Sequence, residues 1–130
     1  MPRRQTINPD WLWNRTVGIA QAVRMGDTVH VSGQTARDPG GNLIGGGSTL
    51  EQARQVFRNI EEVLGMAGAS MKDVVKVVAY FTPGAVFAEY AQARREFLEP
   101  LTFAATGVTV TALADPGMLL EVETVAVIGS

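Results

Sequence analysis

Residues 48–68 read STLEQARQVFRNIEEVLGMAG and contain the clearest helix pattern in the chain. Ser48 and Glu51 have the spacing of a capping box, in which the serine caps the first turn and the glutamate reaches back. Apolar residues then recur at helical spacing, so one side of the helix is apolar. Gly68 predicts the end of the helix, because glycine readily adopts the left-handed conformation that follows many helices.

Patterns on both sides of this helix predict the other elements of the fold. A second helix and five strands are expected, with the helix at residues 85–98 and the strands at 16–23, 28–34, 74–81, 104–113 and 119–127. The order ββαβαββ predicts an α+β fold, in which two helices cover one face of a single sheet. The second helix is expected to turn Phe87, Tyr90, Ala91, Phe97 and Leu98 toward that sheet.

Residues 1–130 are expected to form one domain, because the chain has no internal repeat and no linker long enough to divide it. Residues 1–15 are interpreted as an N-terminal lead-in. Its tryptophans, Trp11 and Trp13, either wall an aromatic pocket or pin this segment to the core. The glycine-rich segment 38–47 lacks the Lys-Ser/Thr ending of a phosphate-binding loop, so it indicates a flap or turn rather than a nucleotide site.

The composition narrows the class of protein. Only 18% of the 130 residues are charged, against about 25% in an average globular chain. A low charge favours an oligomer that buries part of its surface, although 14 glycines would lower the charged fraction of a monomer too. The net charge of −2 and the scattered basic residues argue against nucleic-acid binding.

The cysteine count is zero, which excludes disulfides, thiolate catalysis and Cys-ligated metal. His30 is the one histidine, and no second histidine or carboxylate cluster lies near it in the sequence, so no metal site is expected. It is interpreted as a strand histidine facing a helix or a neighbouring subunit, with a proton carrier as the alternative. The chain shows neither an apolar run of membrane-spanning length nor a signal-peptide pattern, which predicts a cytoplasmic protein with no membrane partner.

Several short motifs resemble, in sequence order, the Rid (YjgF) family of small proteins, also described as endoribonuclease L-PSP-like. The motifs are Val31-Ser32-Gly33-Gln34, the helix from Gln52 to Asn59 with Ile60, Gly68, Asp73-Val74-Val75-Lys76 and Glu121-Val122-Glu123. The resemblance spans about residues 17–127. It implies the chorismate-mutase-like Rid fold, a barrel-like homotrimer and three ligand clefts between neighbouring subunits, with no cofactor.

The resemblance also implies which residues line each cleft. The family's water-orienting glutamate falls on Glu121, and the serine and glycine of its cleft fall on Ser32 and Gly33. The segment Phe103-Ala104-Ala105-Thr106-Gly107-Val108 resembles the family's active-site strand. Thr106 follows the position of a functional arginine, and Gly107 takes a position that is small or cysteine in the family.

Three positions depart from the family's imine deaminases. The arginine that holds the substrate carboxylate is replaced by Ala105, a tyrosine on the first strand by Ile19, and an asparagine on the second helix by Ala91. Alanine has no donor and no charge, so Ala105 cannot make the forked pair that recognises a carboxylate. The changes indicate either a site reshaped for a less charged ligand or a site released from catalysis.

Other residues near the expected cleft carry two interpretations. Arg15, Arg24 and Arg37 are the cations near the cleft segments; one of them could replace the carboxylate anchor, although a surface charge is the commoner role. Glu121 and Glu123 share one face of the last expected strand, where burial could raise a pKa for acid–base work. The resemblance favours Glu121 as the cleft residue, whereas Glu123 is interpreted as a solvated or ion-paired side chain.

These observations give two functional hypotheses from different classes. The leading one is a deaminase-like hydrolase or a tautomerase, acting on a small imine or enamine other than a simple 2-imino acid, with Glu121 positioning or deprotonating water. The Ser32–Gly33 turn would hold polar groups of the substrate. The alternative is a non-catalytic trimer that binds a small metabolite or a partner protein. A ribonuclease is disfavoured, because phosphodiester cleavage without metal needs paired acid–base groups and cations.

Overall fold

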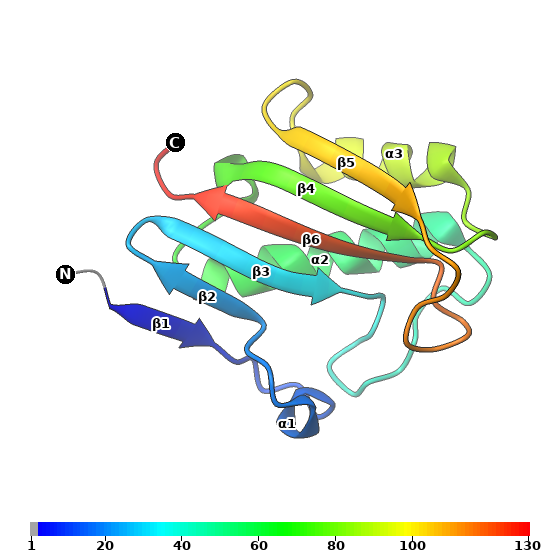
Figure 1. The fold of residues 1–130 in the computed structure, drawn as a ribbon, viewed down its shortest axis with the longest axis horizontal. Coiled ribbons are helices and arrows are strands. Elements are labelled where there is room, and N and C mark those ends of the chain that lie inside the picture. Colours follow the sequence, from blue (N-terminus) through cyan, green and yellow to red (C-terminus); the bar gives the residue numbers. More distant parts are fainter. Residues whose placement is uncertain (1–2) are drawn as a thin grey trace.

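A six-stranded sheet with two long helices on one face forms the fold of residues 3–130, which the computed structural model describes (Figure 1). In sequence order the elements are β1 (Arg4–Ile7), α1 (Asn14–Val17), β2 (Ala22–Met25), β3 (Thr28–Gln34), α2 (Thr49–Met66), a 3-10 turn η1 (Met71–Asp73), β4 (Val74–Phe81), α3 (Phe87–Phe97), β5 (Ala104–Thr109) and β6 (Leu120–Val127). The strand order is β1-β2-β3-β6-β4-β5, and β4 and β5 are parallel. The predicted α+β fold with one sheet is confirmed.

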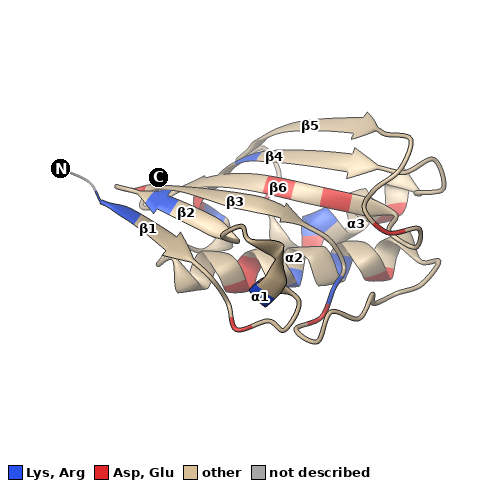
Figure 2. Ribbon diagram, turned by 60° about the horizontal axis from the view of Figure 1, so that its bottom comes forward, with Lys and Arg blue, Asp and Glu red and all other residues tan. Residues whose placement is uncertain are grey.

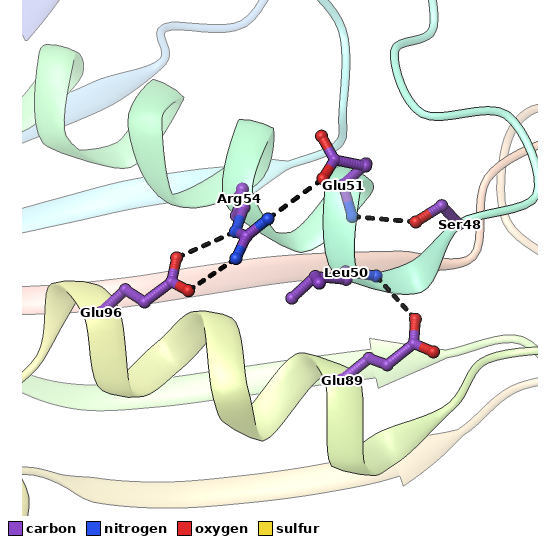
Figure 3. Close-up of polar contacts among 6 residues, drawn as sticks. All are labelled: Ser48, Leu50, Glu51, Arg54, Glu89 and Glu96. Atoms are coloured by element: carbon purple, nitrogen blue, oxygen red, sulfur yellow. Dashed lines mark hydrogen bonds and ion pairs between the residues drawn. The ribbon is translucent and has the colours of Figure 1, made fainter.

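Helix α2 begins and ends at the predicted residues. The Ser48 hydroxyl accepts a hydrogen bond from the Glu51 N–H at 3.1 Å (Figure 3). The Glu51 side chain was expected to reach back to Ser48, and this part is wrong, because its carboxylate pairs with Arg54 instead. After the helix, Gly68 has φ +84°, in the left-handed region that glycine favours.

The neighbouring helix completes the first turn of α2. The Leu50 N–H donates to the Glu89 carboxylate of α3 at 3.0 Å, and Arg54 forms a two-bond pair with Glu96 of the same helix (Figure 3). Val86, at the start of α3, donates its N–H to the Thr49 hydroxyl. These contacts fix the two helices side by side on the sheet.

The segment before β3 departs most from the prediction. Residues 14–17 form α1, which Gly18 ends at φ +82°, so the strand expected at 16–23 is wrong and β2 begins only at Ala22. Gln21 donates to the Asn14 side chain at 2.7 Å, and this buried contact holds the intervening residues as a loop. Met1 and Pro2 of the expected lead-in lie outside the described residues.

The lead-in also contains a strand that the sequence pattern did not reveal. Strand β1 pairs antiparallel with β2 and forms one edge of the sheet. Trp11 is almost fully buried in the core and stacks on Trp13, with 5.5 Å between ring centroids. The pinning interpretation therefore holds for Trp11.

The core lies between the sheet and the two long helices. Alternate residues of β3, β4 and β6 point toward the helices and are buried, among them Val29, Val77 and Val122, and Phe57 and Ile60 of α2 pack against them. Phe87 of α3 turns toward the sheet as expected, with its ring centroid 5.8 Å from that of Phe81, although the residue is 59% exposed. No helix of residues 3–130 is both long and apolar enough to cross a membrane.

Helices α2 and α3 leave the opposite face of the sheet uncovered (Figure 2). Both acidic residues of β6, Glu121 and Glu123, lie on this open face, because they alternate along the strand with buried residues of the helix-covered face. His30 is exposed there as well, paired across the sheet with Val23 and Val125. Of the two surroundings expected for His30, the helix is therefore wrong, and the neighbouring subunit stays a prediction.

Candidate functional site

Glu121 occupies the open face beside a β-bulge in β3. Ser32 and Gly33 stand opposite a single residue of β6, Glu123, because the pairing shifts between Val31 and Gln34. A Cβ built on Gly33 would lie 2.7 Å from Oε2 of Glu121. The glycine therefore provides the space that the Glu121 carboxylate occupies.

The surroundings of Glu121 disfavour its charged form. Partial burial is the main cause that raises the pKa of Glu121, and the charge of Glu123 adds to it. Tyr80 of β4 donates its hydroxyl to Glu123, and this bond, with burial, raises the pKa of Tyr80. Glu121 is consequently a carboxyl group whose surroundings favour its protonated form over its charged form.

Glu121 and Gly33 line a pocket of about 420 Å³ that we call the Glu121 pocket. It brings together two of the expected site residues from β3 and β6 with Ile19 from the loop after α1. The other lining residues are Trp13, Thr16, Val17, Gln21, Thr35, Arg37, Ala114 and Met118. Trp13 thus walls a pocket, as one of the two interpretations of the tryptophans had it.

Ser32 takes a structural position beside this pocket. Its hydroxyl donates to the Ala20 carbonyl at 2.7 Å, which ties the bulge to the loop that carries Ile19. A chain of buried amides runs parallel to this bond, from Gln34 to Gln21 and on to Asn14. These bonds hold the Ile19 side of the Glu121 pocket.

Two polar side chains of α2 hold the other loops around the pocket. Gln52 is fully buried, donates to the Gly117 carbonyl and accepts the Leu119 N–H, both at 2.9 Å. Asn59 donates to the carbonyls of Thr35 and Arg37. The polar positions of the helix motif therefore fix the segments that precede β6 and follow β3.

The three arginines singled out from the sequence all have partners within the chain. Arg37 lines the Glu121 pocket but pairs with Asp115 and donates to the Gly41 carbonyl. Arg15 pairs with Asp10 at 2.7 Å. Arg24 donates to the carbonyls of Gly26 and Ala67, away from the pocket.

Ala105, Thr106 and Gly107 lie together on β5, at the far edge of the sheet from β1. Ala105 and Gly107 pair with Val77 and Ala79, buried residues of the helix-covered face, so they face α3. They line a hollow of about 180 Å³ that we call the α3–β5 pocket, together with Thr106, Ala79, Phe87, Tyr90 and Arg94. The whole of β5 is exposed.

The single chain therefore separates the expected site residues into two groups. Strand β4 lies between β5 and β6, and Glu121 and Ala105 face opposite sides of the sheet. Ala91 is nearly buried on α3 and lines neither pocket. Within residues 3–130, no group of three or more His, Cys, Asp or Glu side chains is arranged to hold a metal ion.

Two residues of these sites had not been singled out from the sequence. The signal for Tyr80 is the pairing register of β4 and β6, which places Tyr80 directly across from Glu121. Arg94 lies four residues after Tyr90 on α3, which is the spacing of neighbours on a helix surface. Its position beside Ala105 depends on how α3 packs on β5, and no local pattern reports that.

Comparison with known proteins gives matches along most of the chain. The family described as Endoribonuclease L-PSP matches residues 16–128. A RutC family protein of Pyrococcus abyssi is 35% identical over 107 residues, which are 82% of this chain and 84% of the relative. A mouse protein named 2-iminobutanoate/2-iminopropanoate deaminase is 29% identical over 110 residues, covering 85% of this chain and 81% of that protein.

Solved structures agree with the same assignment of the fold. RidA from the Antarctic bacterium Psychrobacter superimposes with a TM-score of 0.85 at 34% identity, covering 95% of this chain and 99% of that chain. A YjgF/YER057c/UK114 family member from Mycobacterium tuberculosis gives 0.83 at 31% identity, covering 97% and 100%.

Proposed function

Because the chain belongs to the Endoribonuclease L-PSP family, which includes Rid and YjgF proteins, we propose that it acts on a small imine or enamine other than a simple 2-imino acid. Glu121 carries this proposal: it is a half-buried carboxyl with a raised pKa in a pocket of about 420 Å³. Relatives named 2-iminobutanoate/2-iminopropanoate deaminase support the imine chemistry. The reaction is hydrolysis or tautomerisation.

In the hydrolytic reaction, Glu121 orients a water molecule and accepts its proton as the oxygen attacks the imine carbon. The proton passes to the nitrogen and gives a carbinolamine. Its hydroxyl proton then reaches the amino group as the carbon–nitrogen bond breaks, and the products are a carbonyl compound and ammonia. One water is consumed for each ammonia released, so no oxidant or reductant is needed. A carboxyl with a raised pKa suits both the proton-accepting and the proton-donating step.

The site is proposed to be complete only in a homotrimer. In this arrangement a neighbouring copy brings its Ala105, Thr106 and Gly107 to the Glu121 pocket, which unites the two groups that one chain separates. The exposed strand β5, with one edge unpaired in residues 3–130, supports such a contact.

Simple 2-imino acids are expected to be poor substrates. Ala105 offers no donor to a carboxylate, and hydrogen bonds to charged groups contribute about 1.5–3 kcal/mol each. Arg37, the cation of the Glu121 pocket, is already paired with Asp115. An Ala105→Arg variant is expected to gain turnover of 2-iminobutanoate, since it adds the missing donors.

The test is ammonia release from freshly generated imines, including 2-iminobutanoate and larger members, with wild type beside Glu121→Gln. We expect turnover of a larger imine that falls at least about 100-fold in Glu121→Gln and is unchanged in Glu62→Gln, a matched exposed carboxyl of α2. Equal activity of Glu121→Gln and wild type would refute the role of Glu121. Efficient wild-type turnover of 2-iminobutanoate would refute the substrate restriction alone.

A second candidate is a non-catalytic trimer that binds a small metabolite. The apolar Ile19 and Ala105 and the internally bonded Ser32 hydroxyl favour it, because they leave few polar contacts for a reacting group. It predicts that Glu121→Gln shifts the affinity for a ligand while no imine is turned over by wild type.

A further inference from the structure

Arg94 is a half-buried cation at the edge of the α3–β5 pocket. Its guanidinium carbon lies 5.4 Å from the ring centroid of Tyr90 and 5.5 Å from that of Phe103. Among residues 3–130, no acidic side chain forms an ion pair with it. By contrast, Arg54, also partly buried, pairs with both Glu51 and Glu96.

The contacts of Arg94 within the chain leave its guanidinium without a negatively charged partner. Contact with an aromatic face contributes about 0.5–2 kcal/mol, but it leaves the forked donors of the guanidinium without an acceptor of opposite charge. The C-terminal end of α3 also favours a cation, and both Arg94 and Arg95 lie in its last turn. The helix-end effect acts on both arginines, so it does not explain why Arg94 packs against the rings of Tyr90 and Phe103 while Arg95 is exposed.

The pocket beside Arg94 is shaped by small residues facing aromatic ones. Ala105 and Gly107 leave the β5 side open, and Phe87 and Tyr90 form the α3 side. A second hollow of about 230 Å³ continues from Gly107 along Phe81 and Phe87. A ligand in this space meets apolar surface along most of its length and one cation at its end.

We propose that Arg94 binds the carboxylate of an acid whose remaining part is apolar or aromatic. A planar carboxylate matches the paired N–H donors of a guanidinium, and the partly desolvated setting strengthens this bond. The inference rests on the proposed function and names the substrate class of that site, a carboxylic acid with an apolar or aromatic part. The substrate carboxylate is bound by Arg94 of α3 rather than by a residue at position 105. A short 2-imino acid then lacks the apolar part that fills the pocket, whereas a longer acid has it.

Binding of phenylacetate and of its uncharged counterpart phenylacetamide, measured by titration calorimetry, tests the inference. We expect wild type to bind phenylacetate at least about tenfold more tightly than phenylacetamide. Arg94→Met should lose this preference, because it keeps an unbranched apolar stem without the charged guanidinium. Arg58→Met removes an exposed charge from α2 and is expected to behave as wild type. Thermal unfolding of each variant checks that it is folded.

Two results would overturn the inference. One is the same preference for phenylacetate in Arg94→Met, and the other is no binding of phenylacetate to folded wild type. Glu121→Gln in the same titration separates this inference from the proposed function, since we expect its preference to be unchanged. If wild type prefers phenylacetate through Arg94 but turns over no imine, the proposed function is refuted and the carboxylate site stands. If wild type turns over an imine but shows no such preference, the carboxylate site is refuted and the proposed function stands.

Discussion

The absence of a side chain at position 33 controls where the Glu121 carboxylate lies. Gly33→Ala places a Cβ 2.7 Å from Glu121 Oε2, so we expect the carboxylate to swing toward water and the pKa of Glu121 to return toward its ordinary value. Carbon-13 NMR titration of the Glu121 carboxyl measures this shift. Stability should change little, because the displaced atoms end a flexible side chain.

A matched glycine distinguishes this effect from a general effect of alanine. Gly46 has open space where its Cβ would lie, so Gly46→Ala should leave the titration of Glu121 unchanged. An unchanged pKa in Gly33→Ala would show that burial by other residues, and not the bulge, sets the protonation of Glu121.

The raised pKa of Glu121 also makes stability depend on pH. The folded protein binds this proton more tightly than the unfolded chain does, where the pKa is about 4.5. The stabilisation is therefore complete below pH 4.5 and is lost as the pH rises through the folded pKa. We expect the melting temperature of Glu121→Gln, relative to wild type, to be higher at pH 7 than at pH 4.

Glu62→Gln is the control for this comparison, because Glu62 is exposed on α2. The difference in melting temperature between Glu62→Gln and wild type should be nearly the same at pH 4 and pH 7. If the melting temperature of Glu121→Gln falls relative to that of wild type as the pH rises, the folded state favours the charged carboxylate of Glu121.

At the scale of elements, α2 acts as a clamp on two loops as well as a cover for the sheet. Gln52→Leu leaves the Gly117 carbonyl and the Leu119 N–H without their partner. A buried group left unpaired costs about 1–3 kcal/mol, so we expect the free energy of unfolding to fall by about 2 kcal/mol or more in urea denaturation. Gln92→Leu, on the exposed side of α3, should change it by less than about 0.5 kcal/mol; an equal loss in both variants would contradict the clamp.

The elements that the sequence predicted are those with a long, strong pattern. The 18 residues of α2 and the run of eight in β4 carry enough apolar repeats to be recognised locally. Strand β1 has four residues, and it becomes a strand only because β2 offers it a partner. The segment before β2 alternates well enough to suggest a strand, but the buried amide pair of Asn14 and Gln21 decides its conformation.

The candidate site was predictable to the extent that it resembles a known pattern. Gly33, Glu121 and Ile19, three of the positions that the resemblance assigns to the cleft, line one pocket, and their role in it stays a prediction. Ser32 bonds within the chain instead of facing the pocket, and Arg94 was missed. Both depend on contacts between distant segments, which spacing along the chain does not report.

At the scale of the whole molecule, strand β5 has one unpaired edge among residues 3–130, because it pairs with β4 alone. Val108 is 41% exposed there, beside Tyr80 on the open face. If a second copy covers this strand, Val108→Lys should convert the oligomer to monomers, because burying a lone charge is unfavourable. Light scattering after gel filtration measures the change in mass.

Leu12→Lys is the control, since Leu12 is also exposed but lies in the segment between β1 and α1. It should leave the mass unchanged. A wild-type protein that is monomeric at all concentrations would contradict the oligomer and with it the shared cleft.

The position of β6 also governs how the chain can fold during its synthesis. This strand follows the other five in the sequence, yet it lies between β3 and β4 and joins the two parts of the sheet. A nascent chain in which residues 120–127 have not emerged therefore exposes the edges of two separate strand groups. Until β6 is in place, no other strand of residues 3–130 joins β3 to β4, so the incomplete chain exposes two strand edges that the complete sheet pairs.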